Sequence, residues 1–170
     1  MSTPDANELL PRLLASNALR ANLSKHMTLN KMADSKAAMI LTAASLVTTI
    51  ALTRMQDLPL ATVLILAVAG ILAVIFSILA IIPPLHATGQ TNFFYFRSFV
   101  ELEEEEFIAG FKQLLTDKEK LYDAYLHELY YLGKHRLTRK YLLVRNGLCS
   151  LLAGLVLAVI SVFLPLGGGG

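Results

Sequence analysis

The sequence predicts an all-α integral membrane protein with three transmembrane helices and a cytoplasmic helical insert between the second and the third. Three observations support this fold class. Of 170 residues, 55% are hydrophobic and 16% are charged, whereas soluble domains carry about 25% charged residues. Three long stretches contain no ionisable residue. The lysines and arginines are divided very unevenly among the segments around those stretches.

The same figures exclude several other classes of protein. A mean hydropathy of +0.55 and a high apolar content argue against a disordered or collagen-like chain. The single cysteine, Cys149, lies in an apolar run and cannot form an intramolecular disulfide, so we interpret it as a small packing residue. A net charge of +2 is too small to indicate nucleic-acid binding.

The three uncharged stretches have lengths that suit membrane spans. They are 37–53, 58–85 and 146–166. A helix needs about 20 apolar residues to cross the hydrocarbon core, within a range of roughly 17–25. The first stretch is short and contains several hydroxyl side chains, so a buried core helix is the alternative there. Its position beside a stronger span favours a transmembrane hairpin over 35–85. We expect helices near 35–54, 59–82 and 146–166.

Prolines mark the ends of the second expected span. Pro59 suits the first turn of a helix, where a missing N–H costs little. Pro83 and Pro84 are expected to end the same helix, because proline cannot continue the hydrogen-bond ladder.

The positive charges predict the orientation of the chain. Of the 15 Lys and Arg residues, five lie in 1–36, one in the hairpin turn, nine in 86–145 and none after 146. The positive-inside rule therefore places the N-terminus and the long middle segment in the cytoplasm and the C-terminus outside. The glycine tail 167–170 is interpreted as a linker.

Residues 1–34 are expected to form an amphipathic cytoplasmic arm. Leucines at spacings of three and four predict a helix. Asp5 and Glu8 form an Asx version of the capping box, and Pro11 is expected to kink or delay the helix. The arm either packs on the cytoplasmic helices of the same chain or lies on the anionic inner leaflet. At its end, Asp34 and Lys36 stand at the mouth of the first span, as interfacial anchors or as part of a gate or an intersubunit contact.

The insert 86–145 begins with a loop that carries four consecutive aromatic residues, 93–96. They pack under the helices that follow, lie at the lipid headgroups or form a stacking platform for a base. Two capping boxes, Ser98 with Glu101 and Thr116 with Glu119, predict helix starts near 99 and 117. The acidic run 103–106 is interpreted as a solvated face.

The second helix of the insert is expected to run unbroken from 117 to 163, with Gly133 as its one weak point. The cluster 134–145 is strongly basic. Its two interpretations are anchoring to the inner leaflet and a recessed anion site.

The sequence lacks motifs for catalysis or metal binding, and we expect no enzyme, no cofactor and no metal site. No nucleophile elbow, Walker lysine motif or zinc spacing is present. His127 and His135 lie eight residues apart without a matched carboxylate or cysteine. A membrane enzyme acting on lipid is therefore the weakest hypothesis. A membrane-anchored adaptor or regulatory binding module for another protein is a stronger one.

The order of several short motifs around the three spans resembles the Pycsar transmembrane effectors of bacterial antiphage defence. The motifs are Ala33-Asp34-Ser35-Lys36-Ala37, Asn92-Phe93-Phe94-Tyr95-Phe96, Glu128-Leu129-Tyr130-Tyr131-Leu132-Gly133 and Lys140-Tyr141 through Arg145. The resemblance covers about residues 20–165. It implies a partner cyclase that makes cyclic CMP or cyclic UMP on infection, and an effector that impairs the bacterial inner membrane and causes abortive infection. The sequence shows no cyclic-nucleotide-binding β-barrel, so either the insert or a separate protein senses the signal.

The chemistry of such a signal selects the candidate sensing residues. Arginine offers paired donors to a phosphate, and an aromatic face can stack on a base. The candidates are Arg97, Arg136, Arg139, Lys140 and Tyr141.

Small residues on the third span predict close helix packing. Ser150, Gly154 and Ala158 recur every four residues, with Gly147 on nearly the same face. This face packs either against the first two spans of the same chain or between subunits. Because three spans of one chain cannot enclose an aqueous path, we expect a homo-oligomer.

Overall fold

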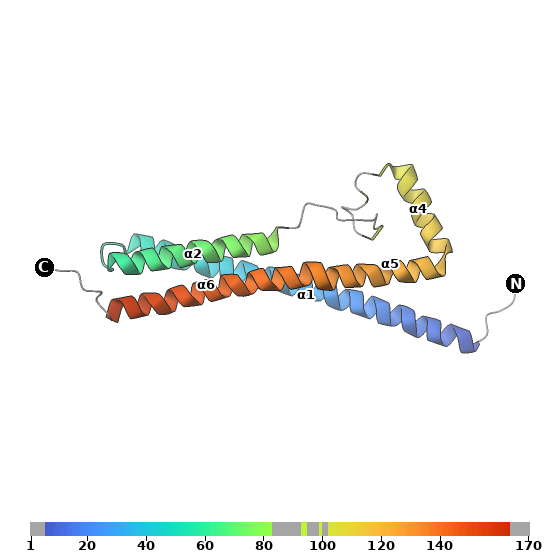
Figure 1. Ribbon diagram of the computed structural model, residues 1–170, viewed down its shortest axis with the longest axis horizontal. Helices are drawn as coiled ribbons and strands as arrows, with labels where there is room; N and C mark the ends of the chain where they lie inside the picture. Colours follow the sequence, from blue (N-terminus) through green and yellow to red (C-terminus); the bar gives the residue numbers. More distant parts are fainter. Residues whose placement is uncertain (1–5, 83–92, 95–98, 100–101, 164–170) are drawn as a thin grey trace. The chain divides into compact units, whose positions relative to one another are not determined.

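The computed structural model describes residues 6–82, 93–94, 99 and 102–163, with side chains described from residue 13 onward. All regular elements of this part of the chain are helices (Figure 1). They are α1 (Ala6–Thr53), α2 (Leu60–Ile81), α4 (Glu104–Thr116), α5 (Lys118–Tyr131), the π-helix η1 (Leu132–Leu137) and α6 (Thr138–Phe163). Three helical stretches are long and apolar enough to cross a membrane, namely Leu13–Thr53, Leu60–Ile81 and Lys118–Phe163. The all-α class with three apolar helices of spanning length is thus confirmed.

The chain divides into two units. The first unit combines Met1–Leu29 with Pro84–Leu137, and the second combines Asn30–Pro83 with Thr138–Gly170. Helix α1 contributes to both units. The second unit contains the apolar helices α2 and α6 and the C-terminal part of α1.

The core of the second unit consists mainly of small side chains. Buried positions follow one another at spacings of three and four along each helix, which is the periodicity of closely packed, nearly aligned helices. They include Ala33, Ala37, Ala44 and Ala51 on α1, Gly70, Ala73, Ser77 and Ala80 on α2, and Gly147, Gly154, Ala158 and Ser161 on α6. The largest side chain with less than 2% exposure is that of Ser77. Small residues at such positions let helix backbones approach closely in lipid.

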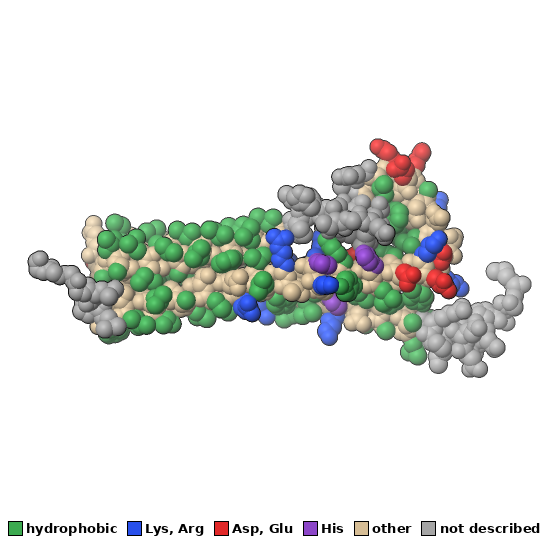
Figure 2. All heavy atoms as spheres, in the orientation of Figure 1, with side chains coloured by type: hydrophobic (Ala, Val, Ile, Leu, Met, Phe, Trp, Pro, Cys, Tyr) green, Lys and Arg blue, Asp and Glu red, His purple; other side chains and the backbone are tan. Residues whose placement is uncertain are grey.

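Many large apolar side chains of the second unit point outward, although Ile40, Val63, Val144 and Leu151 are buried. Exposed examples are Leu46, Ile50, Leu64, Val68, Ile75, Leu152 and Val156. Apolar side chains cover the visible faces of α2 and α6 (Figure 2). A water-soluble domain buries its largest apolar side chains, because each contributes roughly 1.5–3 kcal/mol on burial. The reversed arrangement fits helices whose outer surface meets lipid.

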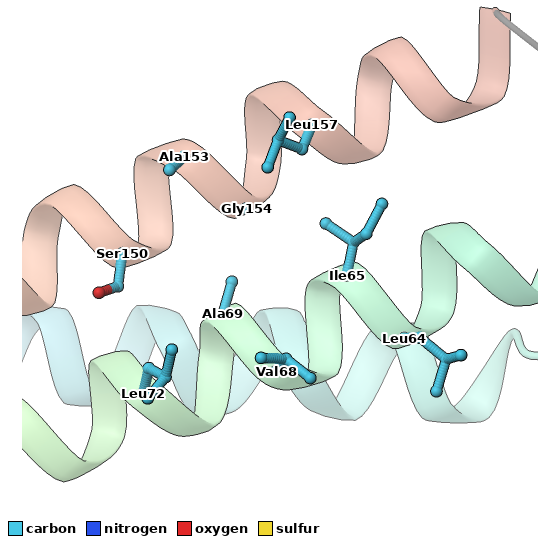
Figure 3. Close-up of a pocket in the computed structure, with 9 residues that line it drawn as sticks. All are labelled: Leu64, Ile65, Val68, Ala69, Leu72, Ser150, Ala153, Gly154 and Leu157. Atoms are coloured by element: carbon cyan, nitrogen blue, oxygen red, sulfur yellow. The ribbon is translucent and has the colours of Figure 1, made fainter.

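Helices α2 and α6 lie side by side in the second unit and approach closely at Gly154. A Cβ atom built on Gly154 would lie 2.1 Å from Ala69 Cβ, so only glycine fits there without movement. Figure 3 shows Ala69 pointing at the backbone of Gly154. An apolar groove borders this contact, lined by Leu64, Ile65, Val68, Ala69 and Leu72 of α2 and by Ser150, Ala153, Gly154 and Leu157 of α6.

The small-residue face predicted on the third span therefore packs within its own chain. Gly147 and Gly154 are buried against α2, and Ala158 on the same face is also buried, whereas Ser150 lies at the edge of the groove. Of the two interpretations that the sequence left open, the structure favours the intrachain one for this face.

Two helix starts differ from the predicted ones. Pro59 is the N-cap of α2 and directly precedes its first residue, Leu60. Pro11 lies within α1, which begins at Ala6, so it does not delay the helix. Asp5, Ser98, Glu101, Pro83 and Pro84 lie outside the described residues.

The predicted capping box at Thr116 is wrong by one residue. Thr116 ends α4, and its hydroxyl donates to the carbonyl oxygen of Gln113 at 2.8 Å. Asp117 instead caps α5, because its backbone is extended and its Oδ1 accepts a hydrogen bond from the Lys120 N–H at 3.2 Å. That bond, together with the nearby Lys120 ammonium, lowers the pKa of Asp117.

Aromatic rings hold α4 against α5 in the first unit. Phe94 stacks on Tyr125 of α5 with ring centroids 4.5 Å apart. Phe93 lies 5.9 Å from Phe107 of α4, and its ring occupies the space that a side chain on Gly110 would need. Of the aromatic run 93–96, the two described residues therefore pack under the helices, which was one of the three predicted roles. Tyr95 and Phe96 lie outside the described residues.

The helix predicted over 117–163 is continuous from Lys118 to Phe163, but its hydrogen-bond pattern changes within it. Leu132–Leu137 form a π-helix between α5 and α6. This wider turn begins beside Gly133, where a Cβ atom would lie 3.3 Å from His26 Nε2 of α1 in the same unit. Single π turns within α-helices are rare and are often found at functional sites.

Candidate functional site

A polar cluster joins α1 and α6 at the start of their apolar stretches, within the second unit. The Lys140 ammonium lies 2.6 Å from Asp34 Oδ1 and donates a hydrogen bond to Asn30 Oδ1 at 2.8 Å. Asn30 and Asp34 are one turn apart on α1, so both reach the same residue of α6. The Lys140 ammonium is aligned for a hydrogen bond with Asn30 Oδ1. Its contact with Asp34 Oδ1 is a close ion pair without hydrogen-bond alignment.

This ion pair is partly removed from solvent. The side chain of Lys140 is 14% exposed and that of Asp34 is 40% exposed. Lys140 is the more buried partner, so the Asp34 carboxylate compensates its ammonium group for the hydration that it loses. The cluster therefore connects the first turn of α6 to α1 near the start of the uncharged stretch of each helix.

Two further predicted residues lie close to this cluster. The Lys36 ammonium stands over the ring of Tyr141 at 5.7 Å from its centroid, a distance typical of a cation–π contact. Tyr141 is half-buried, whereas Lys36 and Arg139 are exposed. Lys140 and Tyr141, selected from the sequence as candidate sensing residues, are thus both engaged with α1.

The remaining candidates are separate from these contacts. Arg136 lies in η1, in the first unit, and is half-buried. Arg97 lies outside the described residues. Arg139 lies in the first turn of α6 with its side chain exposed.

Our predictions from the sequence did not include Asn30, and they gave Asp34 and Lys140 separate roles. One signal was available, since Asn30 and Asp34 share a helix face that enters the apolar stretch. Among the residues that the structure describes, no three or more His, Cys, Asp or Glu side chains gather as metal ligands.

The acidic run of the first unit is exposed. Glu103 caps α4, and the next three glutamates form its first turn. Acidic side chains gather at this end of α4 (Figure 2). They face the positive end of the helix dipole, and their exposure fits the predicted solvated face.

Comparison with known proteins identifies a relationship over most of the chain. A family model described as the Pycsar effector protein domain matches residues 18–167. Comparisons with curated proteins and with solved structures gave no match.

Proposed function

The chain belongs to the Pycsar effector family, and from this premise we propose that cyclic CMP or cyclic UMP activates it to impair the bacterial inner membrane. Membership makes the chain an antiphage defence effector rather than the cyclase of the system. The three apolar helices fit a membrane protein. A partner cyclase would supply the nucleotide, and loss of membrane integrity would end the infection abortively.

The ion pair between Lys140 and Asp34 is the observation that carries this proposal. A cyclic nucleotide monophosphate carries one negative charge, and its phosphate oxygens are good acceptors for an ammonium group. Such a phosphate would compete with the Asp34 carboxylate for Lys140. Because Asp34 belongs to α1 and Lys140 to α6, the exchange would release α1 from α6 at the entrance to the membrane spans.

Neighbouring residues would supply the rest of the recognition. The ring of Tyr141 has a face that already attracts the Lys36 ammonium, and aromatic faces stack on bases. Arg139 is exposed one residue before Lys140 and can donate a pair of hydrogen bonds to a phosphate. Arg97 and Arg136 are the further candidates that we assign to the same sensing role.

We place the N-terminus and the helical segment 86–145 in the cytoplasm, where the nucleotide is made. The distribution of charge supports this orientation. Lys31, Lys36, Arg139 and Arg145 are exposed near the entrance of the spans. At the opposite turn, Arg54 is paired with Asp57 at 3.3 Å. The side of the membrane that carries more Lys and Arg residues is the cytoplasmic side.

Several copies are needed for membrane damage, and we propose that the effector acts as a homo-oligomer. Three helices packed through alanine and glycine leave no room for an aqueous path inside one resting chain. The small-residue face of α6 is used within the chain. The subunit contact therefore belongs to another surface, such as the exposed apolar faces of α1, α2 or α6.

Nucleotide binding to the full chain in detergent tests this proposal. Wild-type protein is titrated with cyclic CMP and cyclic UMP, with cyclic AMP as the ligand control. We expect a cyclic pyrimidine nucleotide to bind, and Lys140→Gln and the double variant Arg136→Gln/Arg139→Gln to lose at least tenfold in affinity. Lys112→Gln, which removes an exposed charge on α4, serves as the matched control and should bind normally. Unchanged binding by the double variant would remove both arginines from the site. If no cyclic pyrimidine binds, the chain instead acts as an adaptor for a separate sensor.

A further inference from the structure

Ser77 is an anomaly in the core of the second unit. Its side chain is 0% exposed, and its Oγ finds no hydrogen-bond partner among the described residues. The hydroxyl lies against Gly147 of α6, 3.5 Å from the position a Cβ would take there. Buried hydroxyls in proteins are nearly always paired, and in a lipid-embedded helix no water is at hand to satisfy them.

Other hydroxyl groups occupy contacts of α2 with its neighbouring helices. Thr62, Gly70 and Ser77 follow one another on α2 at spacings of eight and then seven residues, so they share one face. At Thr62, the hydroxyl pairs with the buried Ser161 of α6 at 2.8 Å. At Gly70, the hydroxyl of Thr48 occupies the space that a side chain would fill.

These four residues, Thr48, Thr62, Ser77 and Ser161, are called the hydroxyl seam. The seam extends through the apolar part of the unit, and the polar cluster of Lys140 and Asp34 lies beyond its Ser77 end. Between Thr62 and Ser77, the buried residues of α2 are Val63, which is next to Thr62, and then Gly70 and Ala73. On the α2 side, the seam is therefore bordered mainly by small side chains.

We propose that the hydroxyl seam becomes the wall of a path for water and small ions when the effector is activated. The inference rests on the proposed function, since it assigns residues to the membrane damage. In the resting chain the glycine contacts close the seam and keep it dry. When α1 is released from α6, the seam parts and its hydroxyls meet water.

The unpaired hydroxyl of Ser77 favours opening of the seam. An unsatisfied buried hydroxyl disfavours the closed state, and water in the opened seam would satisfy it. Replacing Ser77 with alanine removes this bias and favours the closed state. The expected effect is an approximately tenfold fall in nucleotide-triggered leakage, because a typical unsatisfied group shifts an equilibrium by about that factor.

Cysteine accessibility in proteoliposomes tests the wall directly. The native Cys149 is exposed, so it is first replaced by alanine. Ser77→Cys and Thr48→Cys are then treated with a membrane-impermeant methanethiosulfonate, with and without the activating cyclic nucleotide. Ile75→Cys, two residues from Ser77 on the exposed face of α2, is the matched control. Leakage of a trapped dye or of potassium ions is recorded from the same vesicles.

We expect both seam cysteines to be protected at rest and modified after activation, while Ile75→Cys stays unmodified in both states. Modification should reduce the potassium flux, since the added group stands in the path. Leakage from activated vesicles with unmodified seam cysteines would overturn the inference and leave the proposed function intact. Absence of leakage in every condition would overturn the proposed function and the inference with it. Because serine-to-cysteine exchange is small and Thr48 provides a second position, misfolding of one variant does not decide the result.

Discussion

Replacing Gly154 with alanine should separate α2 from α6. The added Cβ would lie 2.1 Å from Ala69 Cβ, whereas two carbon atoms pack at about 3.5–4.0 Å. Neither atom is at the end of a flexible side chain, because both are fixed to helix backbones. The helices must therefore move apart by about 1.5 Å at this point.

The expected loss of stability follows from three terms. Overpacking of a tight contact costs about 1–3 kcal/mol. Ser161 lies seven residues further along α6, so the movement also strains its 2.8 Å hydrogen bond with Thr62, and such a bond in a membrane bundle contributes about 0.6 kcal/mol. The exchange of glycine for alanine returns up to about 1 kcal/mol of helix propensity. The net loss should be about 1–2.5 kcal/mol.

Gly147→Ala provides a matched control on the same face of the same helix. There the added Cβ would lie 3.4 Å from the Ala73 carbonyl oxygen and from Phe76 Cβ, at the margin of ordinary contact. The same substitution should therefore change stability by less than about 1 kcal/mol. The difference between the two variants isolates the clash at Gly154 from general effects of removing a glycine.

Unfolding of the purified protein in mixed detergent micelles, followed by circular dichroism, measures both variants. Ala69→Gly, added to Gly154→Ala, removes the opposing methyl group and should restore most of the lost stability. Equal unfolding curves for Gly154→Ala and Gly147→Ala would refute the packing of α2 against α6 through Gly154. Failure of Ala69→Gly to rescue would place another residue in the contact. A loss of oligomers with an unchanged unfolding curve would assign Gly154 to a subunit interface.

Three further outcomes are expected. A double-mutant cycle of Thr62→Val and Ser161→Ala should give a coupling free energy of about 0.6 kcal/mol in the same unfolding assay, and additive effects would show that the 2.8 Å hydrogen bond is not formed. Asp117 has a lowered pKa in the folded chain, so its contribution to α5 should be complete above the ordinary aspartate value of about 3.9 and decline as the pH falls through the lowered value. Asp117→Asn keeps an N-cap acceptor, so its thermal unfolding should lack this part of the pH dependence below about pH 4, and an unchanged profile would contradict the assignment. A phosphatase fused to the C-terminus should be active and a fluorescent protein fused there should be dark, because the proposed orientation puts the C-terminus outside; the reverse result would invert the topology.

Local features of the sequence predicted much of the fold. The first uncharged stretch forms the C-terminal end of α1, α2 lies within the second, and α6 contains most of the third. This prediction succeeds because a membrane span is a one-dimensional requirement for length and absence of charge. The capping prediction at Thr116 failed by one residue, because Thr116 and Asp117 both bear suitable oxygens and backbone conformation decides between them. The π turn lies beside His26, more than one hundred positions earlier in the chain, and the local sequence around Gly133 did not predict it.

The candidate site shows the same division. The sequence alone determined the apolar stretches, their order, the placement of the positive charges and the resemblance to the Pycsar effectors, because each of these is written in consecutive residues. Only the tertiary structure decided that Lys140 contacts Asp34 and Asn30, that Gly154 faces Ala69, and that Ser77 is buried without a hydrogen-bond partner in the described chain. These contacts join residues far apart along the chain, and their existence depends on how each helix is rotated about its axis. Where side chains are small, the rotation of each helix is set by how closely the backbones pack. The periodicity of the sequence predicts which face of a helix is buried, but it does not predict which neighbouring residue that face contacts.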